Sequence, residues 1–149
     1  MKDLFRIPLL AALCLWAAGA AMALPDGSKE KVQQARSVKE VFSLLGLPEG
    51  LEPGRRILLE VPDIVDSGAK VPVKVTSRIA GTDWIVVLVD RNLAPFVSDE
   101  EFSPGQDRSM SLKVDLAQTS RVRVIVRAGG KFYQVAREVK IATPGCKDK

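Results

Sequence analysis

The chain has 149 residues, with 22 Lys or Arg against 18 Asp or Glu, so its formal net charge is +4. It contains no histidine, which excludes Ser–His–Asp and Cys–His catalysis, the usual zinc ligand sets and c-type haem attachment. The charges are mild and interspersed, and no basic block is interleaved with aromatic residues. Nucleic acid is therefore not an expected partner.

Residues 1–23 have the layout of a secretory signal peptide. A basic start precedes an apolar run, Ile7 to Trp16, and small residues then lead to Ala23,. We expect cleavage after Ala23, a periplasmic mature protein and no membrane contact afterwards. Two alternatives stay open. The run could be a retained anchor, although it is short and rich in alanine. Cys14 could be lipidated, although Leu13 stands where a small residue is expected.

Residues 24–54 are expected to form an N-terminal helix and a linker. From Ser28 to Leu45, apolar residues recur at helical spacing on one side of the predicted helix. Gly46 marks its end, and a Pro/Gly-rich linker, 46–54, follows,. A one-sided apolar stripe must be covered. We expect the helix to pack on its own domain; a surface for a partner protein is the alternative.

Residues 55–141 are expected to form a β-sandwich, because apolar side chains there recur with a period of two between turn signals. The predicted strands are Arg56–Val61, Lys70–Ser77, Asp83–Val89, Ser109–Leu116, Arg121–Arg127 and Lys131–Ile141. The predicted fold class is mainly β: an immunoglobulin-like antiparallel β-sandwich preceded by one N-terminal amphipathic helix. Trp84 is expected in the core. The edges of such a sandwich are either covered by a partner or protected in a monomer.

Three other features have mainly structural interpretations. The acidic residues 99–101 are expected in a solvated turn or at a short helix start, with a cation or acid–base site as the alternative. Arg121, Arg123 and Arg127 share one strand face. They are expected to be solvated, or else to bind an anionic partner or a sulfate-like cargo. The long connection Arg91–Arg108 is expected to cross between sheets or to carry a contact.

The tail, residues 142–149, carries the chemistry. Cys146 is the only cysteine left after signal cleavage, so it cannot form a disulfide within the mature chain. It is a nucleophile as its thiolate, which Lys147 and Lys149 favour and Asp148 opposes. From Ile141, the chain could carry the thiol roughly 15–18 Å from the sheet, at about 3.3–3.6 Å per residue. The alternatives are an intermolecular disulfide or an incidental thiol.

Two segments resemble the SoxY family. Residues 56–73 read Arg-Ile-Leu-Leu-Glu-Val-Pro-Asp-Ile-Val-Asp-Ser-Gly-Ala-Lys-Val-Pro-Val, and residues 132–141 read Phe-Tyr-Gln-Val-Ala-Arg-Glu-Val-Lys-Ile. The first is similar to the start of the SoxY sandwich. The second is similar to its last strand, which leads into a cysteine-bearing tail. That tail ends Gly-Gly-Cys-Gly-Gly in the family. Here Gly145 and Cys146 match, while Pro144 and Lys147-Asp148-Lys149 replace glycines.

The resemblance implies a sulfur carrier of the periplasmic Sox thiosulfate-oxidation system. Cys146 would be the point of covalent sulfur attachment, and Thr143, Pro144, Gly145 and Lys147 would form the carrier arm. It also implies a heterodimer with SoxZ, a second immunoglobulin-like protein, and visits to sulfur-oxidising enzymes. No cofactor and no catalysis by the chain itself are expected. The alternatives are a SoxY-like interaction module without carrier chemistry and an enzyme in its own right.

Overall fold

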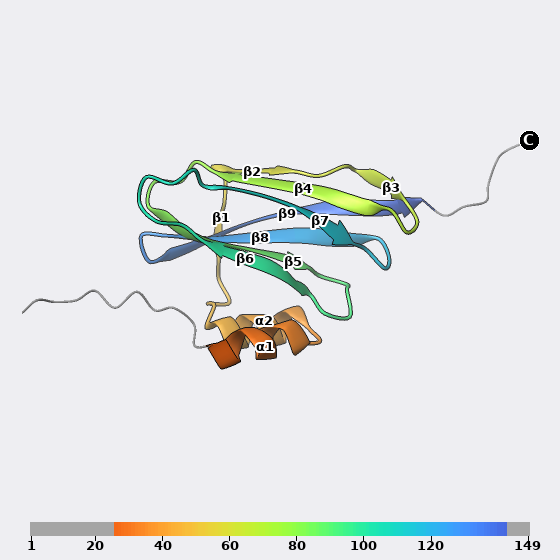
Figure 1. The fold of residues 1–149 in the computed structure, drawn as a ribbon, viewed down its shortest axis with the longest axis horizontal. Coiled ribbons are helices and arrows are strands. Elements are labelled where there is room, and N and C mark those ends of the chain that lie inside the picture. The colour runs from red at the N-terminus through yellow and green to blue at the C-terminus, as the bar shows by residue number, and fades with distance from the viewer. Residues whose placement is uncertain (1–25, 143–149) are drawn as a thin grey trace, which may run out of the picture.

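The protein is built in three layers. In the computed structural model, which describes residues 26–142, two helices cover one face of a six-stranded sheet, and a three-stranded sheet packs on the other face (Figure 1). The helices are α1 (Asp26–Gln34) and α2 (Val38–Leu45). Neither helix in this part of the chain has the length and apolar character that a membrane crossing requires.

The prediction of a single helix over Ser28–Leu45 is wrong, because a second helix starts at a cap inside that range. The Ser37 hydroxyl accepts a hydrogen bond from the Glu40 N–H at 3.1 Å, and the Glu40 carboxylate accepts one from the Arg36 N–H at 2.8 Å. The first bond is that of a capping box, a helix start signal, whereas the second reaches Arg36, one residue before the cap,. Gly46 ends α2 as expected, with a φ of +66° that glycine adopts without strain,.

Replacing Ser37 by Ala should lower the free energy of unfolding by about 1 kcal/mol, because the Glu40 N–H loses its side-chain acceptor. Urea denaturation followed by circular dichroism measures this loss. Ser43→Ala is the matched control: Ser43 is an exposed serine within the same helix, and its replacement should leave the midpoint nearly unchanged. Equal midpoints for the two variants would show that the cap does not stabilise the fold.

The large sheet has the strand order β1-β9-β8-β5-β6, and β3 also pairs with β9. Its strands are β1 (Glu52–Pro53), β3 (Ile64–Asp66), β5 (Thr82–Val89), β6 (Phe96–Glu101), β8 (Ser120–Ala128) and β9 (Lys131–Ala142). The small sheet has the order β2-β4-β7. Its strands are β2 (Ile57–Glu60), β4 (Lys70–Ser77) and β7 (Ser109–Asp115).

The β-sandwich prediction is confirmed, with two corrections. Strands β1 and β3 were not expected, and both pair in parallel with β9, so the sheet is not wholly antiparallel. The connection 91–108 contains another unexpected strand, β6, which pairs with β5. The chain crosses to the small sheet after β6, which was one of the two expectations for this connection.

The long β8–β9 hairpin turns at the glycine pair that separates its two predicted strands, Arg121–Arg127 and Lys131–Ile141. Gly129 and Gly130 have φ values of +58° and +75°, the left-handed pair that a two-residue hairpin turn requires. The register then runs from Ala128 opposite Lys131 to Ser120 opposite Val139. This hairpin places the end of β9 beside the start of β8.

Two apolar clusters bury opposite faces of the large sheet. Between the sheets lie Ile85, Val87 and Val89 of β5 with residues of β2, β4, β7, β8 and β9. Between the sheet and the helices lie Trp84, Val86, Leu88 and Ile125 with Val32, Ala35, Val41 and Leu47. Both faces of β5 are therefore covered, which explains its near-continuous apolar run. The helices pack on their own domain, and Trp84 is in a core, as expected.

Candidate functional site at the base of the tail

The structure describes the base of the tail. Cys146 and the predicted arm residues Thr143, Pro144, Gly145 and Lys147 lie outside the described residues, as do residues 1–25 with the predicted signal peptide. Ala142, the last residue of β9, is four positions before Cys146. The described structure therefore bears on the tail through the contacts of the last residues of strand β9, which precede it.

The end of β9 is held on both of its edges. On one edge β9 pairs with β8 as far as Val139. On the other, β3 pairs in parallel with Lys140–Ala142, and the Lys140 N–H donates to the Asp63 carbonyl at 2.9 Å. The Ile141 N–H donates to the Thr119 hydroxyl at 3.0 Å. Backbone groups that are hydrogen-bonded to several partners resist local opening. The end of β9, from which the tail continues, is therefore rigidly held by the sandwich.

A polar hollow of about 270 Å³ lies next to this base. Its lining residues are Asp90, Arg91, Thr119, Ser120, Arg121 and Glu138. Thr119 also binds the Ile141 N–H, so the hollow and the tail base share a residue. The Ser120 hydroxyl accepts the Arg91 N–H at 3.0 Å. Basic, acidic and hydroxyl groups are mixed here, so the hollow has no strong preference for one sign of charge.

The three arginines of β8 do not form one solvated row, contrary to the expectation. Arg123 donates from Nε and Nη2 to the two oxygens of Asp90 at 3.0 and 2.8 Å, and from Nη1 to Gln134 at 2.8 Å. The hydrogen bonding of its guanidinium to the Asp90 carboxylate raises the pKa of Arg123; burial opposes this shift, and the Asp90 charge adds to it. Arg123 is thus committed to an internal ion pair.

Arg127 is likewise engaged. Its Nε donates to Asp83 at 2.8 Å, and its guanidinium lies 5.6 Å from the centre of the Trp84 ring, within the range of a cation–π interaction. Arg121 is exposed, lines the hollow and makes no ion pair within residues 26–142. Of the three, only Arg121 fits the expectation of solvation.

The acidic residues 99–101 lie in strand β6, and neither the expected turn nor a helix start forms there. Asp99 accepts a hydrogen bond from Trp84 Nε1 at 3.0 Å. Within residues 26–142, no group of three or more Cys, Asp or Glu side chains is arranged to hold a metal ion. The contact with Trp84 gives Asp99 a structural role.

Sequence reasoning missed two residues that secure the tail base, Asp63 and Thr119. The Asp63 carbonyl is 77 positions from its partner Lys140 in the numbering, and the Thr119 hydroxyl is 22 positions from Ile141. No local pattern marks either contact.

Comparisons with known proteins identify the relatives of the chain. The family profile described as "Sulfur oxidation protein SoxY" matches residues 43–146. The sulfur carrier protein SoxY from Chlorobium limicola f thiosulfatophilum is similar in structure, with a TM-score of 0.64 and 30% identity over 70% of this chain and 94% of that one. A superoxide reductase (neelaredoxin) from Ignicoccus hospitalis has a TM-score of 0.54 at 16% identity, over 59% of this chain and 81% of that one. That likeness concerns the fold alone. No curated protein sequence is significantly similar.

Proposed function

Because the chain belongs to the SoxY family of sulfur oxidation proteins, we propose that it is a sulfur carrier that holds sulfur intermediates covalently on the Cys146 thiol for partner enzymes of thiosulfate oxidation. The observation that carries this proposal is the extent of the family match. It continues through the last strand to residue 146, the cysteine itself. The similar SoxY of Chlorobium is named a sulfur carrier.

The thiol has the chemistry that a carrier needs. Joined to a sulfur atom, the Cys146 thiolate forms an S–S bond that a later thiol can cleave by exchange. Joining a thiolate to the outer sulfur of thiosulfate releases two electrons, which a partner oxidoreductase must accept. Partner enzymes then oxidise or hydrolyse the bound group. The carrier supplies attachment and delivery, and the enzymes supply catalysis.

The described body is suited to presentation of an arm. Strand β9 is fixed by β8, by β3 and by Thr119 up to its last residues, and this strand ends at one end of the sandwich (Figure 1). Four residues beyond Ala142 span at most about 14 Å, at about 3.3–3.6 Å per residue. A cargo tethered at that reach has a high effective concentration at any enzyme bound to the same end.

The proposal includes a location and partners. The signal-like residues 1–23 support export to the periplasm, where the mature chain would pair with a SoxZ-like protein of immunoglobulin-like fold. Sulfur-oxidising enzymes would receive the arm. Neither nucleic acid nor a membrane belongs to this function.

Intact-mass spectrometry tests the proposal. The chain, purified from cells oxidising thiosulfate, should carry added sulfur or a sulfonate-bearing adduct that reduction removes. Cys146→Ser should carry none and should abolish thiosulfate oxidation in those cells, while its melting temperature stays within about 1–2 °C of the wild type, because the two apolar clusters of the described domain are formed by other residues,. An adduct that persists on Cys146→Ser would refute attachment at this residue.

One observation favours a second candidate, a SoxY-like interaction module without carrier chemistry. Pro144 and Lys147-Asp148-Lys149 stand where the family has glycines; proline restricts the backbone, and three charged residues add bulk beyond the thiol. Under this alternative, Cys146→Ser cells would oxidise thiosulfate at the wild-type rate, and the mass of the wild-type chain would show no adduct.

A further inference from the structure

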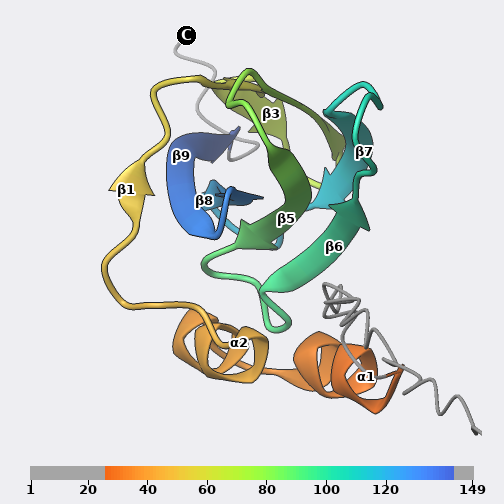
Figure 2. The ribbon, with the colours of Figure 1, turned by 90° about the vertical axis from the view of Figure 1, so that its left-hand side faces the viewer.

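The hollow beside the tail base lies on a part of the large sheet that the helices leave uncovered. Side chains alternate along β8: Val122 lies between the two sheets, and Ile125 lies under the helices. Arg121 is therefore on the helix side, as is Glu138, which lies opposite it on β9,. Both helices stop short of the end of the sandwich at which β9 ends (Figure 1). Looking along the sandwich, β9, β8 and β5 follow one another across this sheet (Figure 2).

The hydroxyl groups of the hollow have protons left to donate. Thr119 Oγ1 accepts the Ile141 N–H and Ser120 Oγ accepts the Arg91 N–H, each at 3.0 Å. A hydroxyl group can also donate one proton, and within residues 26–142 neither of these two hydroxyls donates a hydrogen bond. Ser120 is only 2% exposed, and buried polar groups normally find partners. The hollow therefore offers two donors that still need an acceptor.

The charges that remain available in the hollow are mainly positive. Both oxygens of Asp90 accept hydrogen bonds from Arg123, so an internal partner already neutralises this carboxylate. Within residues 26–142, Arg91, Arg121 and Glu138 make no ion pair, although Arg121 and Glu138 lie opposite each other. Two guanidinium groups and one carboxylate remain. Together with the two hydroxyl donors, they favour a small anion over a cation.

The chain beyond β9 is long enough to fold back onto the hollow. Residues 143–146 read Thr-Pro-Gly-Cys, with proline second and glycine third, the preference of a type II turn, whose ends lie within about 7 Å of each other. At its end, one edge of β9 is taken by β3, whereas β8 pairs with the other edge only as far as Val139. The side of Thr119 and the hollow is thus the one open to a returning tail.

We propose that the hollow is a binding site for the arm's own cargo and that it takes the sulfonate end of a group carried on Cys146. The three sulfonate oxygens would accept hydrogen bonds from Arg91, Arg121 and the two hydroxyls. The volume of about 270 Å³ is several times the share of one water molecule in the liquid, about 30 Å³. Docking would shield the S–S bond of the cargo from thiols in solution. This inference rests on the proposed carrier function for its ligand.

Tetrathionate loads this ligand without any enzyme. The Cys146 thiolate attacks one of the two central sulfur atoms, the central S–S bond breaks, and thiosulfate leaves with the electron pair. The thiol then carries an –S–SO₃⁻ group, and no further oxidant is consumed. Methyl methanethiosulfonate gives the matched neutral cargo, –S–CH₃, with methanesulfinate as its leaving group. Both reagents are applied to the mature chain, in which Cys146 is the only cysteine.

Amide NMR spectra of the two loaded forms show whether the sulfonate docks. Relative to the methyl form, the sulfonate form should have shifted amide signals for Thr119, Ser120 and Arg121. Signals of residues far from the hollow, such as Arg78 in the connection before β5, should coincide in the two forms. Identical signals at 119–121 in both forms would overturn the proposal.

The rate at which 2-mercaptoethanol, an uncharged thiol, removes the cargo measures the shielding. Arg121→Gln should speed removal of the sulfonate cargo about three- to tenfold, because charge-assisted hydrogen bonds are lost. Glu138→Gln should slow it about twofold or more, because a repelling carboxylate is removed. Arg78→Gln is the matched control, an exposed arginine at the other end of β5, and should have no effect. The methyl cargo should leave all variants at one rate, and thermal melts should show that they are folded.

Free sulfate distinguishes a tethered ligand from a dissolved one. Because a short tether gives millimolar effective concentrations, sulfate added to Cys146→Ser should shift the signals of 119–121 only at about 10 mM or above. Saturation below about 1 mM, without shifts in the loaded chain, would assign the hollow to a free oxyanion and overturn the tethered ligand. Absence of a Cys146 adduct in cells would instead refute the carrier function, since chemical loading does not depend on it.

Discussion

Arg123→Met is expected to lower the free energy of unfolding by about 2–3 kcal/mol. The Arg123 and Asp90 side chains are only 21% and 19% exposed, and their Nη2 and Oδ2 atoms are 2.8 Å apart. Removing the arginine leaves the Asp90 carboxylate largely desolvated without its bidentate partner, and it leaves the Gln134 oxygen without a donor. Removing one partner of a buried ion pair lowers the free energy of unfolding by more than the intact pair contributes, because the remaining charge is buried without a counter-charge.

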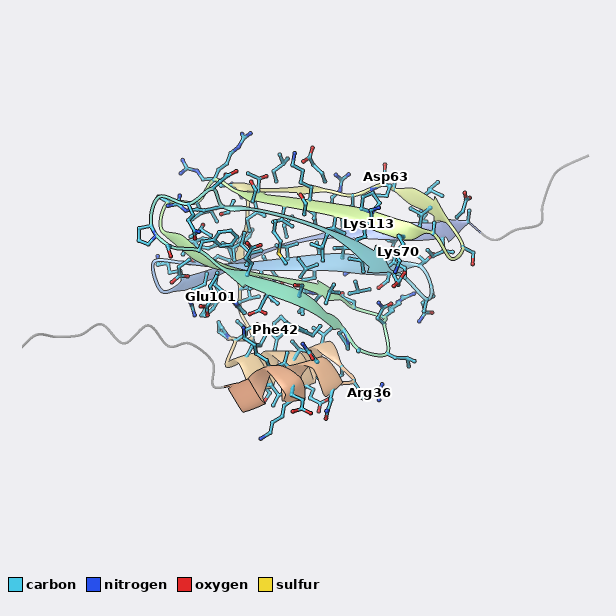
Figure 3. All side chains as sticks on the ribbon, viewed as in Figure 1. Arg36, Phe42, Asp63, Lys70, Glu101 and Lys113 are labelled. Carbon is cyan, nitrogen blue, oxygen red and sulfur yellow. The ribbon has the colours of Figure 1, made fainter. Side chains whose placement is uncertain are left out.

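A second ion pair in the same protein provides the control. Lys70 Nζ and Asp115 Oδ2 are similarly close, at 2.7 Å, but these side chains are 60% and 74% exposed. Water screens this pair, so Lys70→Met should change the free energy of unfolding by less than about 1 kcal/mol. Figure 3 shows Lys70 projecting from the sandwich surface. If Arg123→Met and Lys70→Met lowered the free energy of unfolding equally, burial would not determine how much each ion pair contributes to stability.

The double variant Arg123→Met with Asp90→Asn identifies the mechanism. If the stranded charge causes the loss, neutralising Asp90 should recover about 1 kcal/mol or more relative to Arg123→Met alone. Strict additivity of the two substitutions would place the effect in lost packing of the arginine stem. Guanidinium chloride denaturation at equilibrium, with both single variants measured in parallel, gives the coupling free energy.

Val41→Asp is expected to cost about 3–5 kcal/mol, enough to unfold much of a small domain. Val41 of α2 is 0% exposed and lies in the cluster between the helices and the large sheet. An aspartate there would be buried without an ion-pair partner, or the helix would leave the sheet. Figure 3 shows Phe42, the next residue, in the same layer between α2 and the sheet.

Leu44→Asp is the matched control, because the same acid enters the same helix three residues later. Leu44 is 36% exposed, so a carboxylate at this position remains hydrated. Its cost should stay below about 1 kcal/mol. Thermal unfolding of the two variants and the wild type measures the difference in stability. A small cost for Val41→Asp would mean that the helices are not docked on the sheet in solution.

The secondary structure was largely accessible to pattern reasoning because its signals are local. The period-two segments correspond to β2, β4, β5, β7, β8 and β9, and the glycine pair at 129–130 indicated the turn of the β8–β9 hairpin. The apolar spacing correctly predicted helical structure over this segment, but it did not predict the interruption between α1 and α2. Both helices keep their apolar residues on one stripe, so periodicity continued across the cap at Ser37, and only the Ser37-x-x-Glu40 signal marked it.

The strands that were missed depend on tertiary pairing. Strands β1 and β3 are two and three residues long, too short for any period, and they exist because β9 offers them an edge. Strand β6 carries Ser98, Asp99, Glu100 and Glu101, a composition that intrinsic propensity assigns to a turn. The paired edge of β5 and the Trp84–Asp99 hydrogen bond outweigh that propensity.

The sequence by itself determined the fold class, the position of Cys146 as the only cysteine beyond the predicted signal peptide and the resemblance to SoxY, because composition, periodicity and motif order are properties of the linear chain. Tertiary structure alone decided the roles of the arginines and the anchoring of β9. Arg123 and Asp90 are 33 positions apart, and Ile141 and Thr119 are 22 apart. Contacts over such separations form only when strands are packed together, and no local pattern encodes which partner each side chain will meet.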